Sequence, residues 1–165
     1  MVEQNIVLIG MPGCGKSHIG KMLAKQMERE FLDTDKMIEE KTAMPVPEIF
    51  ALHGEAFFRA LESECAETCA KLSGKVIATG GGMVLKAENI RLLKENGRLY
   101  YLRRDLRLLP RKGRPLSSSL EALEKMFCQR SPLYLQAADC VLDNQAQPQQ
   151  AMQAILEDFR ENSSH

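Results

Sequence analysis

Apolar residues in the first part of the chain alternate between short runs and a helical spacing. Residues 6–9 form a continuous apolar run, Ile-Val-Leu-Ile, which predicts a buried strand. After a glycine-rich loop, apolar side chains recur at helical spacing from Ile19 to Met27 and predict a helix over residues 16–30. A second short strand is predicted over residues 31–35. The chain therefore opens as strand, helix, strand.

The same alternation continues along the rest of the chain. Further strands are predicted at residues 75–79, 98–102 and 140–142, and further helices at 36–41, 47–52, from 55 to about 72, 85–95, 120–130 and 152–159. Strands joined through helices form crossover units, so the sheet should be parallel. The 165 residues suit one domain, 1–165, of the α/β class.

The loop between the first strand and the first helix carries a phosphate-binding motif. Residues 10–17 read Gly-Met-Pro-Gly-Cys-Gly-Lys-Ser and match all four fixed positions of G-x-x-x-x-G-K-[ST]. The glycines let backbone N–H groups turn inward around an anion, and the following helix adds the positive end of its dipole. Lys16 can reach the β- and γ-phosphates, and the Ser17 hydroxyl can ligate Mg²⁺. A glycine-rich turn without a ligand is the alternative, but the flanking strand and helix favour nucleotide binding.

Two acids, Asp33 and Asp35, lie at the end of the second predicted strand. If residue 34 is extended, both carboxylates point to the same side, at the edge where open α/β sheets bind ligands. One carboxylate could then serve a metal and the other a substrate hydroxyl. The alternative is that Asp35 only caps the helix over residues 36–41.

Two further features point to an acceptor site. Arg59 and Glu62 are three residues apart on a predicted helix and can pair, which would hold the guanidinium in one orientation; a surface ion pair is the alternative. Three successive glycines, residues 80–82, follow the strand at 75–79. They suggest backbone lying close to a ligand, with a flexible turn as the alternative.

A basic segment follows the strand at 98–102. Six positive side chains between residues 103 and 114 accompany a single acid, Asp105, and regular structure is opposed by Pro110, Gly113 and Pro115. A mobile lid over the γ-phosphate, here residues 105–119, would need this composition. A nucleic-acid surface is the alternative, but no aromatic residue is interleaved. Beyond the lid, the sequence predicts that Pro132 interrupts the chain just after Arg130.

The composition of the chain limits the classes of binding partner that we expect. Lys plus Arg and Asp plus Glu both number 22, so no overall charge directs the protein to nucleic acid or anionic lipid. The run at residues 6–9 is far shorter than a signal peptide core or a membrane span, which predicts a cytoplasmic protein. The five cysteines are expected to be reduced, and the pair Cys65 and Cys69 to be small buried hydrophobes rather than half of a metal site. A monomer is expected.

The motifs, taken together and in this order, resemble the shikimate kinase family of nucleoside-monophosphate-kinase-like P-loop proteins. The resemblance is carried by residues 10–17, 33–35, 58–62, 80–82, 114–116, 130–134 and 143–148. It implies a three-layer α/β fold with a five-stranded parallel sheet, a substrate-binding region at about 33–62 and a mobile lid. It also implies transfer of the γ-phosphate of ATP, with Mg²⁺, to the 3-hydroxyl of shikimate in the route to chorismate and the aromatic amino acids.

The resemblance further implies roles for the acceptor-site residues. Asp35 would bind the acceptor hydroxyls and act as base or orienter. Arg59 and Arg130 would clamp the shikimate carboxylate, with Glu62 fixing Arg59, and substrate would also meet the backbone N–H groups of Gly80, Gly81 and Gly82. Guanidinium forks suit a planar carboxylate, which agrees with arginine at both positions.

On the nucleotide side, the resemblance implies that Ser17 and Asp33 hold Mg²⁺, Asp33 through water, and that the loop at 143–148 lies at the edge of the adenine. The catalytic set would be Lys16, Asp35 and Arg114. The nucleotide would contact Gly13, Cys14, Gly15, Lys16, Ser17, His18, Arg107 and Arg114. Arg107 lies seven residues before Arg114, where the family often carries a second nucleotide-contacting arginine, but the segment before the lid is about one helical turn shorter here.

Two other functions stay open from the residues. A kinase of another small acceptor, such as gluconate or a nucleotide, would also use arginines; the two acids with the triple glycine favour shikimate. A nucleotide-binding regulator that had lost the chemistry would be expected to lack at least one of the reactive residues, and all of them are present.

Overall fold

The structure is a computed structural model that describes residues 3–110, 114–116, 118–145 and 147–163. Its described strands are β1 (Asn5–Ile9), β2 (Phe31–Asp33), β3 (Val76–Ala78), β4 (Gly97–Arg103) and β5 (Cys140–Asp143). Its described helices are α1 (Lys16–Met27), α2 (Thr34–Thr42), α3 (Val46–Ala70), α4 (Ala87–Lys94), α5 (Leu120–Ala137) and α6 (Pro148–Asn162), with short 3₁₀ turns η1 (Met83–Leu85) and η2 (Leu106–Leu108).

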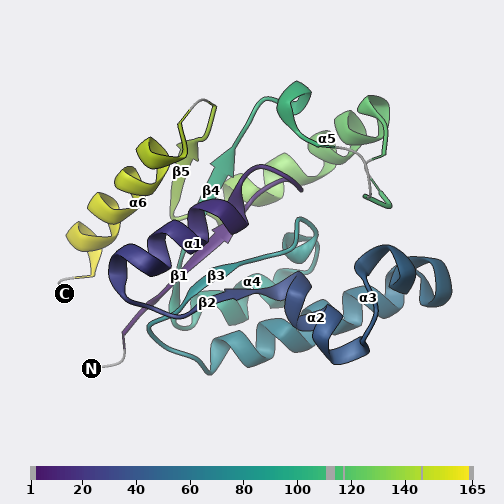
Figure 1. Ribbon diagram of the computed structural model, residues 1–165, viewed down its shortest axis with the longest axis horizontal. Coiled ribbons are helices and arrows are strands. Elements are labelled where there is room, and N and C mark those ends of the chain that lie inside the picture. The colour runs from purple at the N-terminus through teal and green to yellow at the C-terminus, as the bar shows by residue number, and fades with distance from the viewer. Residues whose placement is uncertain (1–2, 111–113, 117, 146, 164–165) are drawn as a thin grey trace.

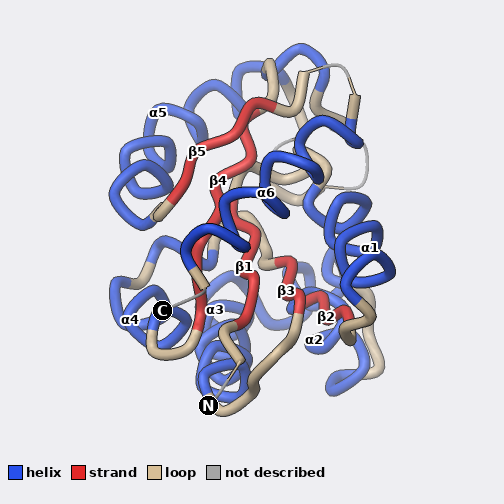
Figure 2. Tube along the Cα trace, turned by 90° about the vertical axis from the view of Figure 1, so that its left-hand side faces the viewer, coloured by secondary structure: helices blue, strands red, loops and turns tan. Residues whose placement is uncertain are grey.

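The described strands form one parallel sheet in the order β2-β3-β1-β4-β5, as the crossover pattern predicts (Figure 1). Helices α1 and α6 cover one face, and α3, α4 and α5 cover the other (Figure 2). All five residues of β1 are buried because this central strand has helices on both faces. The carboxyl ends of the strands meet at one edge, where the phosphate loop and the triple glycine follow β1 and β3.

The predicted strand at 31–35 is too long. Helix α2 begins at Thr34, because the Asp33 carboxylate accepts hydrogen bonds from the backbone N–H groups of Asp35 and Lys36 and so caps the helix. The predicted alternation of Asp33 and Asp35 along a strand is therefore wrong, and so is the alternative in which Asp35 is the cap. The first helix also ends earlier than predicted, at Met27, before Glu28 adopts a left-handed conformation.

The predicted break between two helices lies where α3 bends. Gly54 has φ 82° and ψ 173°, outside the helical region, and divides α3 into two helical stretches. After this break, Phe57 is 41% exposed, whereas Phe58 is 4% exposed and packs with Leu61 and Cys65. Residue 58, not 57, therefore faces the core.

Cys65 and Cys69 are buried, as predicted. Burial raises the pKa of the Cys65 thiol to about 11 and that of the Cys69 thiol to about 12. Both thiols therefore stay protonated at neutral pH and act as small apolar groups.

Two predicted boundaries after β3 are displaced. Helix α4 starts only at Ala87, because residues 83–85 form the 3₁₀ turn η1. The helix ends as predicted near residue 95, but Gly97 is the first residue of β4, where an added Cβ would lie 2.5 Å from the Leu93 carbonyl oxygen. Gly97 thus permits close packing of α4 against β4.

The predicted interruption at Pro132 is wrong. Helix α5 begins at Leu120, capped by the Ser119 hydroxyl, and continues through Pro132 to Ala137. A proline inside a helix costs about 3 kcal/mol. Burial of Tyr134 and Ala137 beyond the proline offsets this cost and keeps the helix continuous. In the described residues, no helix is both long and apolar enough to cross a membrane.

Candidate active site

The loop after β1 is shaped by three glycines with positive φ: Gly10 at 149°, Gly13 at 78° and Gly15 at 102°. The loop surrounds the ammonium of Lys16, whose Nζ donates to the carbonyl oxygens of Gly10 and Met11 at 2.7 and 2.8 Å. Residues with a Cβ rarely adopt such φ values, so the glycines are required for this path. The loop therefore has the conformation that the motif predicts, with Lys16 buried inside it.

Asn144, directly after β5, holds the other side of the loop. Its Nδ2 donates to the Cys14 carbonyl oxygen at 2.8 Å, and an added Cβ on Gly15 would lie 2.5 Å from that nitrogen. The Cys14 side chain is buried in the core, so Cys14 can face a ligand only with its backbone. The loop is thus fixed from a strand distant in sequence.

Ser17 and Asp33 face each other at the N-terminus of α1. The Ser17 hydroxyl donates to Asp33 Oδ2 at 2.8 Å, while the other carboxylate oxygen caps α2. A hydroxyl and one carboxylate, with further positions left to phosphates and water, form a donor set that suits Mg²⁺. Among the described residues there is no cluster of three or more His, Cys, Asp and Glu side chains that could hold a metal without such help.

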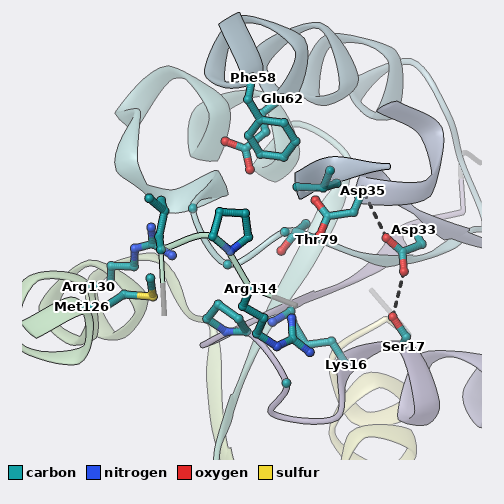
Figure 3. A pocket seen from close by; sticks show the side chains of 18 of the residues that line it. Lys16, Ser17, Asp33, Asp35, Phe58, Glu62, Thr79, Arg114, Met126 and Arg130 are labelled. Carbon is teal, nitrogen blue, oxygen red and sulfur yellow. Dashed lines mark hydrogen bonds between the residues drawn. The ribbon is translucent and has the colours of Figure 1, made fainter. Parts of the chain in front are cut away.

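Asp35 points from the first turn of α2 into the same region (Figure 3). Burial is the largest cause that raises the pKa of its carboxyl; Asp33 adds to the shift, and Lys16 opposes it. Its Oδ1 is buried and has no hydrogen-bond partner among the described residues. An added Cβ on Gly80 would lie 2.5 Å from this oxygen, so the glycine makes room for the carboxylate.

Arg59 and Glu62 form the predicted pair, and it is buried. Arg59 Nη1 lies 2.6 Å from Glu62 Oε1, and the Glu62 side chain is 1% exposed, so the surface-pair alternative is wrong. Burial raises the pKa of the Glu62 carboxyl, and the Arg59 guanidinium opposes that rise. Arg59 also bonds to Glu55 on its outer side, and its guanidinium packs directly against Gly82. The guanidinium is therefore held from two sides.

These groups line one pocket of about 340 Å³, with Arg130 reaching it from α5 on the opposite wall (Figure 3). Arg130 is buried, and its Nε has no hydrogen-bond partner among the described residues. Of the predicted site residues, the pocket lining includes Gly13, Gly15, Lys16, Ser17, His18, Asp33, Asp35, Arg59, Gly80, Gly81, Gly82, Arg114 and Arg130. Cys14 and Arg107 do not belong to this lining.

The basic segment lies next to the phosphate loop at Pro110 and Arg114. An added Cβ on Gly13 would lie 2.5 Å from the Pro110 ring and 3.3 Å from the Arg114 guanidinium, whose Nε donates to the Pro110 carbonyl at 3.2 Å. The Arg107 side chain is 82% exposed and faces Asp105. Residues 111–113 and 117 of the predicted lid lie outside the described residues.

Comparison with known proteins identifies the family. A family described as "Shikimate kinase" matches residues 12–160. The shikimate kinase of Thermodesulfovibrio yellowstonii is 36% identical over 169 residues, with 98% of each chain covered. That of Bordetella avium is 41% identical over 151 residues, covering 87% of this chain and 72% of the relative. The chain belongs to the shikimate kinase family.

Solved structures agree with this membership. A shikimate kinase from Acinetobacter baumannii, in complex with shikimate, is 34% identical, with a TM-score of 0.92 and coverage of 99% of this chain and 96% of that chain. A gluconokinase from Sinorhizobium meliloti, 15% identical with a TM-score of 0.57, shares the fold. The predicted three-layer fold and the predicted family are confirmed.

Sequence reasoning missed part of the pocket in this shikimate kinase family member. An apolar wall comes from Val46, Phe50, Phe58, Leu116 and Met126. Apolar residues on helices predict core positions equally well, so their spacing gave no separate signal. Asn144 belongs to the loop at 143–148 that the resemblance implies for the adenine, but its hydrogen bond to the phosphate loop was missed, because a polar residue after a short strand reads as an ordinary loop residue.

Proposed function

We propose that this chain transfers the γ-phosphate of ATP to the 3-hydroxyl of shikimate in the pocket described above. The observation that carries the proposal is the arrangement of the lining. A proton acceptor, Asp35, and two buried arginines, Arg59 and Arg130, share one pocket with the phosphate-binding Lys16. Such a pocket suits an acceptor that carries both a carboxylate and hydroxyl groups.

Arg59 and Arg130 would bind the shikimate carboxylate from two walls of the pocket. Their guanidinium groups offer planar donor forks, which match a carboxylate better than an ammonium does. The Arg59–Glu62 contact keeps one fork oriented before substrate arrives. Arg130 Nε, which has no partner in the part of the chain that the structure describes, provides a donor on the other wall.

Asp35 would orient the 3-hydroxyl and accept its proton. In the transfer, the hydroxyl oxygen forms a bond to the terminal phosphorus, the bond between that phosphorus and the ADP oxygen breaks, and the hydroxyl proton passes to the carboxylate. Burial raises the pKa of Asp35, which makes the carboxylate a better proton acceptor than an exposed aspartate. Its Oδ1, without a hydrogen-bond partner within the described ranges, can accept from the substrate hydroxyl.

Lys16 and Arg114 would neutralise phosphate charge. The Lys16 ammonium donates to two carbonyl oxygens and to the Cys14 sulfur, all of them neutral acceptors, which charged phosphate oxygens can replace with stronger hydrogen bonds. Phosphoryl transfer depends on placement and charge neutralisation, and both side chains line the pocket beside Asp35. Mg²⁺, when bound, would add positive charge beside the phosphates. Ser17 and Asp33 would hold it.

Several finer assignments belong to the same proposal. The adenine of ATP would lie near the loop after β5. Arg107 would reach the nucleotide only by movement of the lid. Residues 1–165 would act as one domain. We also propose a cytoplasmic monomer. Nucleic-acid and membrane partners are not expected, because the 22 basic and 22 acidic residues leave no overall charge for such surfaces.

A coupled assay of ADP release tests the proposal. With ATP and Mg²⁺, kcat/KM for shikimate should exceed that for gluconate and for nucleoside monophosphates, because the two acids and the triple glycine beside the arginine pair favour shikimate. Faster turnover of gluconate would show that gluconate, and not shikimate, is the acceptor. No turnover of any acceptor, with ATP still bound, would favour a regulator.

A further inference from the structure

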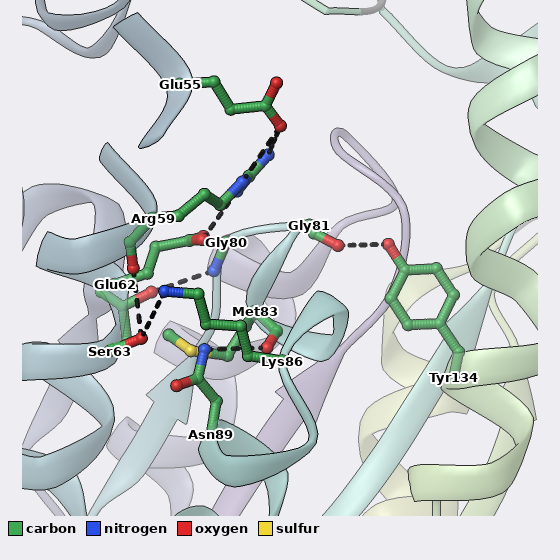
Figure 4. Close-up of polar contacts among 11 residues, drawn as sticks. Glu55, Arg59, Glu62, Ser63, Gly80, Gly81, Met83, Lys86, Asn89 and Tyr134 are labelled. Atoms are coloured by element: carbon green, nitrogen blue, oxygen red, sulfur yellow. Dashed lines mark hydrogen bonds and ion pairs between the residues drawn. The ribbon is translucent and has the colours of Figure 1, made fainter. Parts of the chain in front are cut away.

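The three backbone carbonyls of the glycine turn have different kinds of hydrogen-bond partner. The Gly80 and Gly82 carbonyls accept from the N–H groups of Met83 and Leu85, within the turn itself. The middle carbonyl, of Gly81, instead accepts from the Tyr134 hydroxyl at 2.5 Å (Figure 4). The turn is thus tied to helix α5 through its middle peptide group.

The Tyr134 hydroxyl holds this carbonyl and also interacts with Arg130 on the same helix. The side chain is fully buried, and burial raises the pKa of its hydroxyl, so the group stays a donor at neutral pH. Its hydroxyl also lies 4.0 Å from Met11 Sδ in the phosphate loop. Tyr134 comes one helical turn after Arg130, so both side chains leave α5 on the same face.

The Gly81 carbonyl fixes the plane of a peptide group that has neighbours on both sides. Because a peptide is planar, holding its C=O also sets the direction of the Gly82 N–H. An added Cβ on Gly81 would lie 2.8 Å from the Pro12 ring, and Gly82 packs directly against the Arg59 guanidinium. A rotation of this peptide would therefore disturb the acceptor side of the pocket next to Arg59.

We propose that Tyr134 is a positioning residue for the acceptor: its hydroxyl holds the Gly81–Gly82 peptide in the orientation in which that peptide and Arg59 bind the substrate carboxylate. The inference rests on the proposed function and on the expectation that the backbone N–H groups of residues 80–82 meet the substrate. It assigns to α5 two tasks at this site, a direct one through Arg130 and an indirect one through Tyr134.

A purely structural role for Tyr134 makes a different prediction. Its ring packs against Tyr101, with ring centroids 4.9 Å apart, inside the core. If only this packing matters, replacing the phenol by a phenyl ring of nearly the same volume should leave substrate binding unchanged. Tyr101→Phe makes the same chemical change on the neighbouring ring without touching Gly81, so it is a matched control.

The test compares steady-state kinetics of the unmodified protein, Tyr134→Phe and Tyr101→Phe. In Tyr134→Phe, the buried Gly81 carbonyl loses its donor, so KM for shikimate should rise about 5- to 30-fold. The KM for ATP should not change, because the Lys16 cradle keeps its own hydrogen bonds. Tyr101→Phe should leave the KM for shikimate unchanged. A chain with 4-aminophenylalanine at position 134, which restores an N–H donor, should recover most of the affinity.

Specific results would overturn the inference. An unchanged KM for shikimate in Tyr134→Phe, or an equal rise in Tyr101→Phe, would reduce Tyr134 to a packing residue. If Tyr134→Phe proves too unstable to assay, shikimate binding is compared between 4-aminophenylalanine and 4-methylphenylalanine at position 134, and equal affinities contradict the proposal. Arg130→Ala distinguishes a failure of the Tyr134 proposal from a failure of the proposed function. If Arg130→Ala also leaves shikimate binding unchanged, the proposed acceptor site itself is wrong.

Discussion

The phosphate loop and the acceptor wall meet in one pocket but are built in different ways. The loop is a contiguous stretch, residues 10–17, whose lysine already has two carbonyl partners and whose far side is held by Asn144. The acceptor wall comes from α2, α3, the glycine turn and α5. Among the described residues it keeps buried polar atoms without a partner, on Asp35, Glu62 and Arg130.

This difference indicates where each substrate contributes binding energy. A loop with satisfied hydrogen bonds is already shaped for its ligand, so binding mainly exchanges one acceptor for another. Buried polar atoms without partners cost stability in the free protein, and a ligand that satisfies them recovers that cost. We therefore expect substitutions in the acceptor wall to have larger effects than substitutions that loosen the loop.

The largest effect is expected for Asp35→Ala. Loss of the proton acceptor should lower kcat by about 10²- to 10⁴-fold, while ATP still binds, because Lys16 and the loop are untouched. Stopped-flow or coupled kinetics measure kcat, and isothermal titration measures ATP binding. Unchanged turnover would show that Asp35 serves only the start of α2.

Arg130→Ala is next in size. Removing one buried fork of the clamp should weaken shikimate binding by about 2–5 kcal/mol, without a comparable change for ATP. The control is Arg91→Ala, which removes an arginine that pairs with Glu88 and Glu95 on the exposed face of α4. Equal shikimate affinity in both variants, measured by titration, would remove Arg130 from the clamp.

Asn144→Ala tests the loop side of the comparison. Loss of its hydrogen bond to the Cys14 carbonyl should raise the KM for ATP by about 5- to 10-fold, corresponding to about 1 kcal/mol, and leave the KM for shikimate unchanged. Asn96→Ala is the matched control, since it removes an amide donor to the Leu72 carbonyl far from the loop. A larger effect than that of Arg130→Ala would reverse the proposed ranking of the two regions.

The pH dependence of stability sharpens the same contrast. Because the pKa of Asp35 is raised in the folded protein, the stability that its protonated form contributes is complete below the ordinary value of 3.8 and is lost as pH rises through the raised pKa. Asp35→Asn should therefore be more stable than the unmodified protein at about pH 8, and the difference should shrink toward acid pH. Thermal unfolding across pH measures it. A difference in stability that does not change with pH would argue against a raised pKa for Asp35 in the folded protein.

The smallest effect is expected for Arg107→Ala. An exposed arginine outside the pocket should change the KM for ATP by less than about threefold. A tenfold or larger rise, on the order of 1.4 kcal/mol, would show that the lid carries Arg107 onto the nucleotide. The steady-state KM for ATP is sufficient to decide.

The two regions also differ in how well the sequence predicts them. The phosphate loop is contiguous, and its fixed spacing between a strand and a helix is enough to identify its residues. Arg59, Glu62 and Arg130 can be singled out by residue type and position, but their convergence depends on α3 and α5 both packing against η1, the turn that follows the three glycines. Local spacing holds no information about that packing.

The wrong predictions at Asp33 and Pro132 have physical causes. In each case a local sequence rule was outweighed by another interaction of the folded chain. Asp33 ended a plausible strand, yet its carboxylate also satisfies two N–H groups of α2, and this cap shortened the strand. Pro132 predicted a break, yet burial of Tyr134 beyond it kept α5 continuous. Tertiary burial outweighed local propensity at Pro132.

A crystal structure with both shikimate and ADP bound would test the proposed site most directly. We expect the shikimate carboxylate between Arg59 and Arg130, its 3-hydroxyl within hydrogen-bonding distance of Asp35, and the ADP phosphates in the loop around Lys16. Shikimate bound outside this pocket, or bound with its carboxylate turned away from both arginines, would show that the proposed site is wrong.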